Sequence, residues 1–572
     1  MKLYCISGNK KKLDHYQELQ KIFSSRLFDI VPKEITTSEI QSVKGEEVVR
    51  EKMNQIRKQT SMPFIVDDVS LLVGSNAYPG ALIKHLLENN NTETIPQFLP
   101  DKTPVVVVCY LGYFDGFDSF IFKGELRGET HFDSLDVRAP IQLDTLIFAH
   151  GVPLGVVDST ENHRGKAFQE LVKHIESVRE ERERHNVQVA ERWSKRANEW
   201  QSVREDVASY VNHENGYDRF DTEVNRILPF IFGTAIDVGC GDGAVTRLIS
   251  SNANIKNIIG MDISSEMIQT ATKNTTDSRI RYEVSSFLNT NKRKYHLITS
   301  RGVVLSHMHK TDVLPTLIAF AESLETDGFL VFDYISNIDN NDDAGRMQKN
   351  QLSKEWILAV LTELGLVNIS YNGSETHRVS ILVFHKPIPQ SVYFATGNAT
   401  KVLELKNKCK NHIIHLANVD VTEIKSDDIV EIAKDKAMKS YTVLHHPVIV
   451  TDGGIFIHAL NEFPGPNSKQ AAMLLGPKKI LALMENEIDR TAIRRNCMVF
   501  FDGHNYKICI AEVPLLISHD ITTSKYDAYP LDSILIPIHT DNLKKQTYKQ
   551  MTVTERLMFT ELPFFEEFLA TL

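Results

Sequence analysis

The sequence predicts an α/β protein of three domains, in which two copies of one α/β domain flank a domain of a different kind. Three observations predict this arrangement. The same ordered set of short motifs occurs near both ends of the chain, and a glycine-rich turn unlike those motifs follows an apolar strand in the middle. The length of 572 residues also suits about three or four domains of roughly 150 residues each.

The repeat has landmarks that keep their order and spacing. The first copy opens on Ser7-Gly8-Asn9 and the second on Thr396-Gly397-Asn398. Charged residues follow at nearly constant offsets, which are Lys12, Glu47, Asp68 and Lys84 in the first copy and Lys401, Glu431, Asp452 and Lys469 in the second. This regularity indicates one duplicated domain, which we place at residues 1–176 and 391–572.

Each copy has the strand, loop and helix pattern of an α/β domain. A short apolar strand is expected at 2–6, running into a Gly-Asn turn and a charged helix. A helix around 49–53 leads to a β-branched strand at 64–66 that ends on Asp68. The second copy repeats these elements at 392–395, 433–437 and 448–450, ending on Asp452.

A charged segment connects the first copy to the middle domain. Residues 177–205 are rich in Arg and Glu, which is typical of a solvated helical linker. Trp193 and Trp200 lie seven residues apart, on one helical face, and would dock this helix onto the next domain. Pro387 and Pro389 provide a stiff connection to the second copy.

The middle domain, placed at 190–386, contains a candidate nucleotide-binding loop. Residues 235–243 read Ala-Ile-Asp-Val-Gly-Cys-Gly-Asp-Gly, an apolar strand that breaks into a turn. Glycine at alternate positions lets a ligand approach the backbone closely. The next strand, expected at 257–261, ends in Asp262, where a carboxylate can accept both hydroxyls of a ribose.

This domain resembles the Rossmann-like class I S-adenosylmethionine-dependent methyltransferases. The residues that match are Asp237, Gly239, Gly241, Gly243 and Asp262, which the resemblance assigns to binding of S-adenosylmethionine. The sequence departs from the family at 285–287, where Ser-Ser-Phe replaces an acidic residue near the adenine. His307 and His309 are open to two interpretations, as a general base for a substrate or as solvated surface histidines.

The first copy of the repeat has the groups that a polyphosphate requires. A Gly-Asn turn followed by Lys12 offers backbone donors, an amide and a positive charge, and Lys84 adds a second cation. Glu47, Asp67 and Asp68 supply carboxylates for Mg²⁺ and for a catalytic base.

The ordered set resembles the inosine triphosphate pyrophosphatase family, which hydrolyses non-standard purine nucleoside triphosphates to the monophosphate and pyrophosphate. The resemblance implies triphosphate contacts from Ser7, Asn9 and Lys12, and Mg²⁺ ligation by Glu47 and Asp68, with Asp68 also activating water. The family's Ser-His-Arg, which reads the base, is here Asn162-His163-Arg164. The aromatic residue that stacks on the base is replaced within Leu143-Asp144-Thr145, which removes about 1 to 3 kcal/mol of stacking.

The second copy keeps the phosphate turn and loses other features. The residues implied to bind substrate are Thr396, Asn398, Lys401 and Lys469, and those implied to bind metal are Glu431 and Asp452. Thr451 replaces the first aspartate of the pair, and Thr554-Glu555-Arg556 replaces Ser-His-Arg. Because a glutamate repels a purine carbonyl, we expect this copy to be weak, altered or inactive.

Composition and charge limit the function classes. The chain is 42% hydrophobic and 24% charged, as in ordinary globular proteins. A net charge of −10 argues against broad nucleic-acid binding, which needs a basic face. Six scattered cysteines without a CxxC pair, and the lack of an apolar run of about 20 residues, predict a cytoplasmic protein with reduced thiols and no membrane contact.

These patterns predict a bifunctional enzyme, with nucleoside triphosphate pyrophosphohydrolysis at the first copy and methyl transfer to a small molecule in the middle domain. The nucleotide product is one candidate methyl acceptor. Two alternatives stay open: the flanking copies only bind nucleotide or serve as a scaffold, or the methyltransferase is vestigial. The two copies are expected to pair as an internal pseudo-dimer, and a homodimer is a further possibility.

Overall fold

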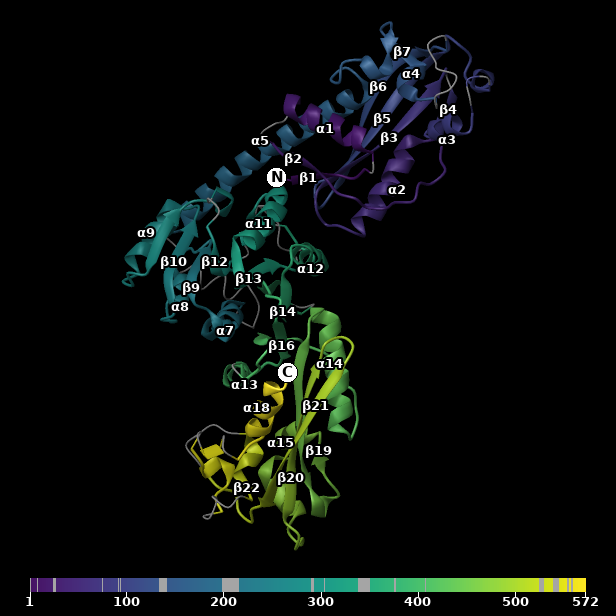
Figure 1. The fold of residues 1–572 in the computed structure, drawn as a ribbon. Coiled ribbons are helices and arrows are strands. Elements are labelled where there is room, and N and C mark those ends of the chain that lie inside the picture. Colours follow the sequence, from purple (N-terminus) through teal and green to yellow (C-terminus); the bar gives the residue numbers. More distant parts are fainter. Residues whose placement is uncertain are drawn as a thin grey trace.

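The protein consists of three α/β bodies, each built around its own β-sheet (Figure 1). The computed structural model describes the chain except for residues 1, 8, 24–26, 75, 91, 93, 133–140, 198–215, 290–292, 303, 338–349, 375–376, 407, 524–528, 539–544, 553–554 and 557–558. Gly8, Trp200 and Thr554, all named above, lie outside the described residues. Among the described helices, none combines the length and apolar character needed to cross a membrane.

The first copy contains a mixed sheet in the order β2-β1-β3-β5-β6-β7-β8, with β4 paired to β3. Helices α1, α2 and α5 pack on this sheet through apolar faces, as the helical spacing predicts. Its elements are β1 Lys2–Cys5, α1 Lys10–Phe23, β2 Asp29–Pro32, α2 Gly45–Arg57, β3 Phe64–Val73, β4 Asn76–Gly80, α3 Ile83–Glu88, β5 Pro104–Phe114, β6 Ser119–Thr130, α4 Leu143–Leu146, β7 Ile147–Ala149, β8 Val152–Pro153 and α5 His163–Ala197.

Strand β3 is longer than the sequence predicts. It does not end on Asp68 but continues to Val73, because Val69 to Val73 pair antiparallel with β5. Its parallel partner β1 pairs with it only as far as Ile65. Asp67 and Asp68 therefore lie just beyond the carboxyl end of β1, next to the turn that begins at Ser7.

The middle domain has the strand order β11-β10-β9-β12-β13-β15-β14, with β15 antiparallel to its neighbours. The chain leaves β9 in one direction and returns to its other side at β12, which makes the β9/β12 boundary a topological switch point. Its elements are α7 Gly216–Ile227, β9 Gly233–Val238, α8 Ala244–Ile249, β10 Ile255–Asp262, α9 Ser265–Lys273, β11 Ile280–Val284, β12 Tyr295–Ser300, α10 Val304–His307, α11 Lys310–Ser323, β13 Leu324–Ile335, α12 Lys354–Glu363, β14 Val367–Asn372 and β15 Val379–His385.

The second copy repeats the topology of the first. Its sheet runs β17-β16-β18-β20-β21-β22, with β19 paired to β18. Tyr393 and Phe394 pair with β18 in the register that Tyr4 and Cys5 use with β3. Its elements are β16 Ser391–Ala395, α13 Ala399–Leu405, β17 Ile413–Ala417, α14 Ile429–Leu444, β18 Val448–Ile457, β19 Pro464–Gly465, α15 Ser468–Leu474, α16 Gly476–Leu483, β20 Thr491–Phe501, β21 Tyr506–Ile517, β22 Leu535–Pro537 and α18 Leu562–Ala570.

Helix α5 joins the first copy to the middle domain. It runs without interruption through the expected boundary at residue 176, so the last helix of the first copy and much of the expected linker form one rod of 35 residues (Figure 1). Asn186 Nδ2 donates to Asp312 Oδ2 at 3.1 Å, and the hydroxyls of Ser194 and Ser264 lie 3.2 Å apart. The helix therefore packs on the middle domain along its second half.

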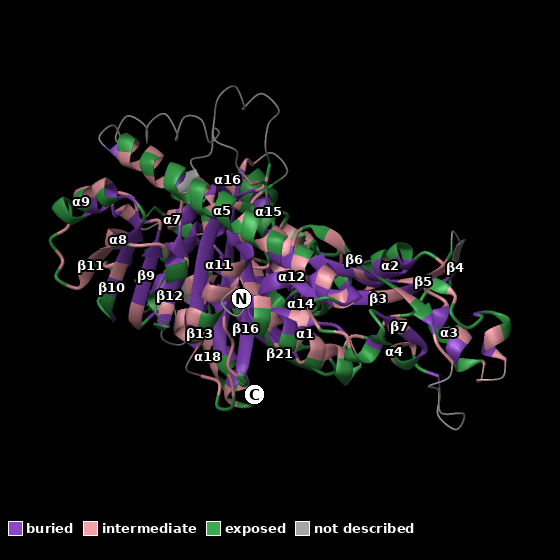
Figure 2. Ribbon diagram, turned by 90° about the horizontal axis from the view of Figure 1, so that it is seen from above, coloured by how far each residue is buried: buried purple, intermediate pink, exposed green. Residues whose placement is uncertain are grey.

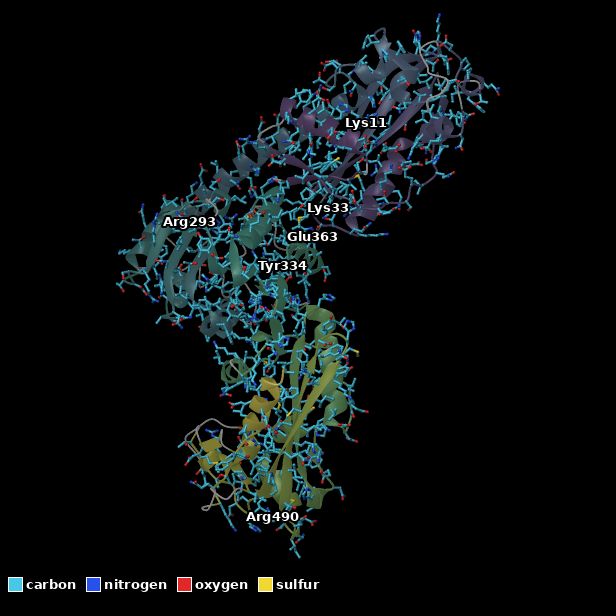
Figure 3. All side chains as sticks on the ribbon, viewed as in Figure 1. Lys11, Lys33, Arg293, Tyr334, Glu363 and Arg490 are labelled. Atoms are coloured by element: carbon cyan, nitrogen blue, oxygen red, sulfur yellow. The ribbon has the colours of Figure 1, made fainter. Side chains whose placement is uncertain are left out.

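A polar contact joins the first copy directly to the middle domain. Glu363, at the end of α12, accepts hydrogen bonds from Lys33 Nζ at 2.7 Å, Thr60 Oγ1 at 2.6 Å and Ser61 N at 2.9 Å. Lys33 and Glu363 face each other across this junction (Figure 3). Nearby, Trp356 Nε1 donates to the carbonyl of Gly116 at 2.8 Å.

The middle domain and the second copy share a hydrophobic core. One cluster of buried side chains includes Leu297 and Ile381 of the middle domain together with Tyr393 and Val450 of the second copy. Buried residues follow the strands of this region, whereas exposed residues gather on the outer helices (Figure 2). The second copy is therefore anchored to the middle domain by apolar burial.

The expected pseudo-dimer is not the arrangement of this structure. The two copies lie on opposite sides of the middle domain, which separates them (Figure 1). The reason is visible in the connections, since α5 holds the first copy against one side of the middle domain while the shared core holds the second copy against the other.

Candidate functional site

The turn after the first strand has a similar hydrogen-bond pattern in both copies. In the first copy, Ser7 Oγ accepts from the Asn9 amide at 3.1 Å, and Asn9 Oδ1 accepts from the Lys11 amide at 3.0 Å. The second copy has Thr396 Oγ1 accepting from the Asn398 amide at 3.1 Å, and Asn398 Oδ1 accepting from the Lys401 amide at 3.3 Å. In both, the asparagine caps the following helix, whose N-terminus carries partial positive charge.

Asp67 lies at the centre of an ion network in the first copy. Its Oδ1 is 2.7 Å from Lys12 Nζ, and its Oδ2 is 3.1 Å from Arg164 Nε. Burial alone would raise the pKa of this carboxyl, but the two cations hold it well below its usual range. Asp67 is therefore ionised, and it orients Lys12 and Arg164 beside the turn.

Asp68 has a different environment from its neighbour. Its Oδ1 accepts from Lys52 Nζ at 3.1 Å, and Lys52 also pairs with Glu39 at 2.7 Å. Its Oδ2 is buried and has no hydrogen-bond partner among the described residues. Burial raises the pKa of this carboxyl, which favours its acceptance of a proton. Because Oδ2 has no partner among the described residues, it is the oxygen that is free to bind a metal ion or a proton.

Glu47 lies in the first turn of α2 and is exposed to solvent. It accepts from Ser42 Oγ at 2.9 Å and from Lys44 Nζ at 2.8 Å. Among the described residues, Glu47 and Asp68 belong to no group of three metal-ligand atoms within 4.8 Å of one another. This suits Mg²⁺, which is commonly held by one or two carboxylates together with substrate phosphates and water.

His163 is buried at the start of α5, next to Arg164. Neither ring nitrogen has a hydrogen-bond partner among the described residues, although the residue is only 2% exposed. Burial lowers its pKa well below the usual value, so the ring is neutral and offers one donor and one acceptor. Lys84 is exposed on α3, 3.9 Å from Glu88.

The second copy retains part of this network. Lys401 Nζ lies 3.4 Å from Thr451 Oγ1 and 3.8 Å from Glu561, so a neutral hydroxyl stands where the first copy has an aspartate. Asp452 is half-buried, and its partial burial raises its pKa, while Glu431 accepts from Ser426 Oγ at 2.8 Å. Lys469 is exposed on α15.

Sequence reasoning missed Lys52 as a member of the site. A lysine in a charged helix is usually solvated, yet Lys52 is 6% exposed and lies between Glu39 and Asp68. Its counterpart Lys436 lies 2.8 Å from Glu423, so the pair recurs at the same spacing in both copies. That recurrence is the signal in the sequence that identifies it.

In the middle domain, Asp237 and Asp262 lie on either side of the glycine-rich loop in the sequence and have different hydrogen-bond partners. Asp237 accepts from Thr246 Oγ1 at 2.7 Å and from Thr299 Oγ1 at 2.9 Å, and burial raises its pKa to about 6. Asp262 accepts from the amides of Gly241 at 3.0 Å and Ser264 at 2.9 Å. Asp262 therefore ties the end of β10 to the glycine-rich loop, whereas Asp237 ties the end of β9 to α8 and β12.

The three glycines of this loop have left-handed backbone conformations. Their φ values are 70° at Gly239, 52° at Gly241 and 79° at Gly243, which side-chain-bearing residues rarely adopt. A Cβ on Gly239 would lie 2.3 Å from Val304, whereas a Cβ on Gly241 would meet no atom within 4 Å. The space beside Gly241 therefore has room for a ligand, as binding of S-adenosylmethionine requires.

A chamber of about 1320 Å³ opens from this loop. Its walls include the loop itself, Arg182 and Trp193 of α5, and Lys2 and Asp29 of the first copy. It is therefore built by three parts of the chain, and it is larger than many single-ligand pockets of about 300 to 1,000 Å³. Its volume leaves room for more than one small molecule.

The two histidines left open by the sequence have different positions. His307 lines the chamber, with its ring centroid 5.5 Å from that of Trp193. His309 caps α11, and its Nδ1 lies 2.8 Å from Thr311 Oγ1. The geometry favours a helix-capping role for His309, and His307 is the one that faces the chamber.

The first copy presents opposite ends of its strands to the two sites. Lys2, Asp29 and Met62, at or before the first residues of β1, β2 and β3, line the chamber. Lys12 and Asp67 instead lie beyond the carboxyl end of β1. A nucleotide bound at Lys12 would therefore lie at the opposite end of β1 from the chamber.

Comparisons with known proteins match all three domains. The model of the Ham1 family matches residues 3–174 and 392–559, and a methyltransferase domain model matches residues 235–328. A dITP/XTP pyrophosphatase from Saccharolobus solfataricus is 35% identical over 163 residues, which is 28% of this chain and 82% of that protein. A dITP/XTP pyrophosphatase from Methanosarcina mazei is 43% identical over 103 residues, so the match covers 18% of this chain and just over half, 56%, of that relative.

Two solved structures are similar to parts of this chain. A HAM1 protein from Coxiella burnetii has a TM-score of 0.28 and 20% identity, and the match covers 32% of this chain and 96% of that chain. An S-adenosylmethionine-dependent methyltransferase from Clostridium acetobutylicum has a TM-score of 0.27 and 15% identity, covering 33% of this chain and 99% of that chain.

Proposed function

The chain belongs to the Ham1 family, and we propose that its first copy hydrolyses non-standard purine nucleoside triphosphates to the monophosphate and pyrophosphate. We further propose that the middle domain transfers a methyl group from S-adenosylmethionine to a small molecule held in the chamber. The observation that carries the first proposal is the pair Asp67 and Asp68, one fully engaged by cations and the other with a free oxygen.

In this proposal different residues of the first copy bind the phosphates, accept the proton and hold the metal ion. The Ser7–Asn9 turn, the N-terminus of α1 and Lys12 bind the phosphates, and Asp67 keeps Lys12 and Arg164 in place. Asp68 accepts a proton from the attacking water through its free Oδ2. Asp68 and Glu47 would hold Mg²⁺, which neutralises the charge that develops on the phosphates.

We propose that His163 reads the base. A buried neutral imidazole with two unpartnered nitrogens can donate to a purine carbonyl and accept from a neighbouring N–H. Such a buried group costs free energy unless a ligand satisfies it, which supports a binding role.

In the middle domain the loop at Gly239, Gly241 and Gly243 and the carboxylates of Asp237 and Asp262 would hold S-adenosylmethionine. The methyl acceptor would lie against Trp193 and His307, with His307 placed to take a proton from it. Because the nucleotide site lies beyond the carboxyl end of β1 and the chamber lies at the amino ends of β1 and β3, we propose that the two activities act on separately bound molecules.

The second copy is proposed to be a scaffold with weak or no hydrolytic activity. The shared core with the middle domain favours the structural role, and the exchange of an aspartate for Thr451 disfavours catalysis. A homodimer and a cytoplasmic location also belong to this proposal.

The test is pyrophosphate release from a panel of nucleoside triphosphates with Mg²⁺. We expect ITP, dITP or XTP to be cleaved by the wild type and not by Asp68→Asn. Asp14→Asn, an exposed aspartate of α1, is the matched control and should retain activity. Release from no substrate would refute hydrolysis and favour nucleotide binding alone.

Methyl transfer is tested separately with labelled S-adenosylmethionine and candidate acceptors, followed by mass spectrometry. Asp262→Ala should abolish cofactor binding. If the wild type does not bind S-adenosylmethionine, the methyltransferase is vestigial.

A further inference from the structure

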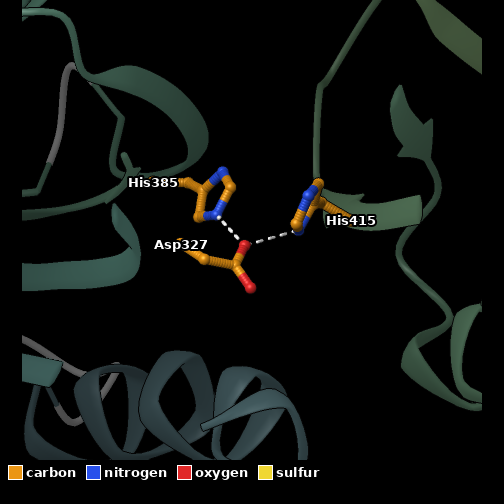
Figure 4. Close-up of side chains that lie close together, drawn as sticks. All are labelled: Asp327, His385 and His415. Carbon is orange, nitrogen blue, oxygen red and sulfur yellow. Dashed lines mark hydrogen bonds and ion pairs between the residues drawn. The ribbon is translucent and has the colours of Figure 1, made fainter. Parts of the chain in front are cut away.

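Three potential metal ligands meet where the middle domain joins the second copy. They are Asp327, His385 and His415, and their ligand atoms all lie within 4.8 Å of one another (Figure 4). His385 Nε2 is 3.0 Å from Asp327 Oδ1, and His415 Nδ1 is 3.5 Å from the same oxygen. The two imidazole rings are 4.2 Å apart between centroids.

The fold holds these residues from three strands of two domains. Asp327 lies in β13 in a left-handed conformation with a φ of 67°, where its amide donates to the Lys386 carbonyl at 2.8 Å. His385 is the last residue of β15, and His415 lies in β17, the edge strand of the second copy. Both histidines are buried, whereas the Asp327 side chain is 30% exposed.

The far nitrogen of each ring is held by a hydroxyl group. His385 Nδ1 lies 2.8 Å from Tyr393 Oη, and His415 Nε2 lies 3.1 Å from Ser391 Oγ. These contacts orient the near nitrogens, His385 Nε2 and His415 Nδ1, toward Asp327. Metal-binding histidines have this same arrangement, in which the second nitrogen is anchored by an outer partner.

We propose that Asp327, His385 and His415 bind one divalent transition-metal ion of the zinc class. Two nitrogens and one carboxylate suit zinc and its neighbours, whereas Mg²⁺ and Ca²⁺ take oxygen ligands. Two bonds of about 2.0–2.1 Å at a tetrahedral ion place their ligand atoms about 3.3 Å apart, close to the 3.0 Å and 3.5 Å separations of this cluster.

A hydrogen-bonded triad without metal fits these distances less well. The contact between His385 and Asp327 has the length of a hydrogen bond, but the 3.5 Å from His415 Nδ1 to the carboxylate is too long for a good one. The exposed side of Asp327 leaves access for an entering ion and for a water as fourth ligand.

Such an ion would cross-link the middle domain to the second copy. Asp327 and His385 belong to one domain and His415 to the other, so the bound metal would fix their relative position. Because binding stabilises the state that contains the complete site, the metal should raise the unfolding temperature of the full chain.

The experiment uses the full-length chain, stripped of metal with a chelator and titrated with Co²⁺ in excess Mg²⁺. The excess Mg²⁺ occupies oxygen-ligand sites such as the one proposed at Asp68, so those sites contribute little Co²⁺ binding. We expect one equivalent of Co²⁺ with visible absorption typical of a tetrahedral ion, displaced by Zn²⁺. Asp327→Asn and His415→Gln should each lose this equivalent.

His504→Gln, a histidine in an exposed turn of the second copy, is the matched control and should bind like the wild type. Circular dichroism checks that each variant is folded. Because the two variants change different domains, the test still works if one of them misfolds. The proposal is overturned if the wild type shows no Mg²⁺-resistant binding, or if folded Asp327→Asn and His415→Gln both keep it. These outcomes are independent of pyrophosphate release.

Discussion

Lys12 Nζ lies 2.7 Å from Asp67 Oδ1, and this ion pair distinguishes the two copies of the repeat. In the second copy the corresponding lysine, Lys401, has only the hydroxyl of Thr451 at 3.4 Å and the more distant Glu561. The turns at Ser7 and Thr396 share a hydrogen bond from the asparagine amide to the hydroxyl, so the clearest difference between the copies is the partner of the lysine.

Replacing Asp67 by Asn should destabilise the first copy. The change leaves Lys12 and Arg164 without a charged partner in a site where Asp67 is 5% exposed. Loss of one member of a buried ion network costs roughly 3 kcal/mol or more, and we expect the low end because both cations are partly exposed. Urea unfolding, followed by a probe placed in the first copy, measures this loss in the free energy of unfolding.

Asp14→Asn, on the exposed face of α1, is the control and should unfold like the wild type. Asp67→Asn should also raise the KM for nucleotide, since Lys12 loses its orientation. An unchanged urea midpoint and an unchanged KM together would contradict the structural role of Asp67.

The sequence predicts much of this fold because the same ordered motifs occur in both copies of the duplicated domain. The motif order indicates the duplicated domain, and the two sheets share one strand order, with β8 as an additional edge strand in the first. The glycine turn likewise indicates the middle domain, which the methyltransferase model matches. The extent of β3 could not be predicted, since Asp67 and Asp68 interrupt an apolar run that continues only because β5 pairs along it.

Residues that act across domains are the least visible in the sequence. Asp327, His385 and His415 are isolated in the chain, and only the packing of β17 against the middle domain brings them together. The placement of the two copies on opposite sides of the middle domain has the same origin. The relative orientation of the domains, which α5 and the shared core determine, cannot be predicted from any local sequence pattern.

His163→Leu should weaken recognition of the base without weakening the fold. Both ring nitrogens are buried and unpartnered among the described residues, so leucine removes no protein hydrogen bond seen there. We expect the preference for ITP over ATP, measured as the ratio of kcat/KM, to fall by about tenfold, the value of one hydrogen bond near 1.4 kcal/mol.

The same variant tests the pKa of His163. Burial lowers the folded pKa well below 6.5, so below that pH the unfolded chain binds a proton that the folded protein does not. Wild-type stability therefore falls as the pH decreases through about 6.5. His163→Leu should lose less stability between pH 7 and pH 5; equal losses would show that His163 protonates in the folded state.

Asp237→Asn should stabilise the cofactor-free protein at neutral pH. Burial raises the folded pKa of Asp237 from 3.8 to about 6, so between these values the folded protein holds a proton that the unfolded chain has lost. The free energy of unfolding of the wild type therefore falls as the pH rises from about 4 to 6 and is flat above. Because asparagine does not ionise, the variant lacks this pH-dependent loss in the free energy of unfolding, which is at most about 3 kcal/mol.

The difference in the free energy of unfolding between the wild type and Asp237→Asn should be small at pH 4 and largest above pH 6. Urea unfolding of the full chain, followed by a probe in the middle domain, measures it. The hydroxyls of Thr246 and Thr299 can still bond to an amide, which limits the offsetting loss. A difference that does not vary with pH would show that Asp237 titrates normally.

Gly241→Ala should remove S-adenosylmethionine binding while largely preserving the fold. Its φ of 52° is unfavourable for alanine by about 1 to 2 kcal/mol, but a Cβ there meets no protein atom within 4 Å. The added methyl group would instead enter the space that we assign to the cofactor. Gly365→Ala is a matched control, because Gly365 has a φ of 83° and equally open surroundings in the same domain, away from the loop.

Thermal unfolding and calorimetric titration with S-adenosylmethionine separate the two effects. Both variants should lose a similar few degrees in Tm, since they carry similar backbone strain. Only Gly241→Ala should lose affinity, by at least about tenfold or 1.4 kcal/mol. Equal affinities in the two variants would place the cofactor elsewhere in the chamber and would leave the left-handed loop with a purely structural role.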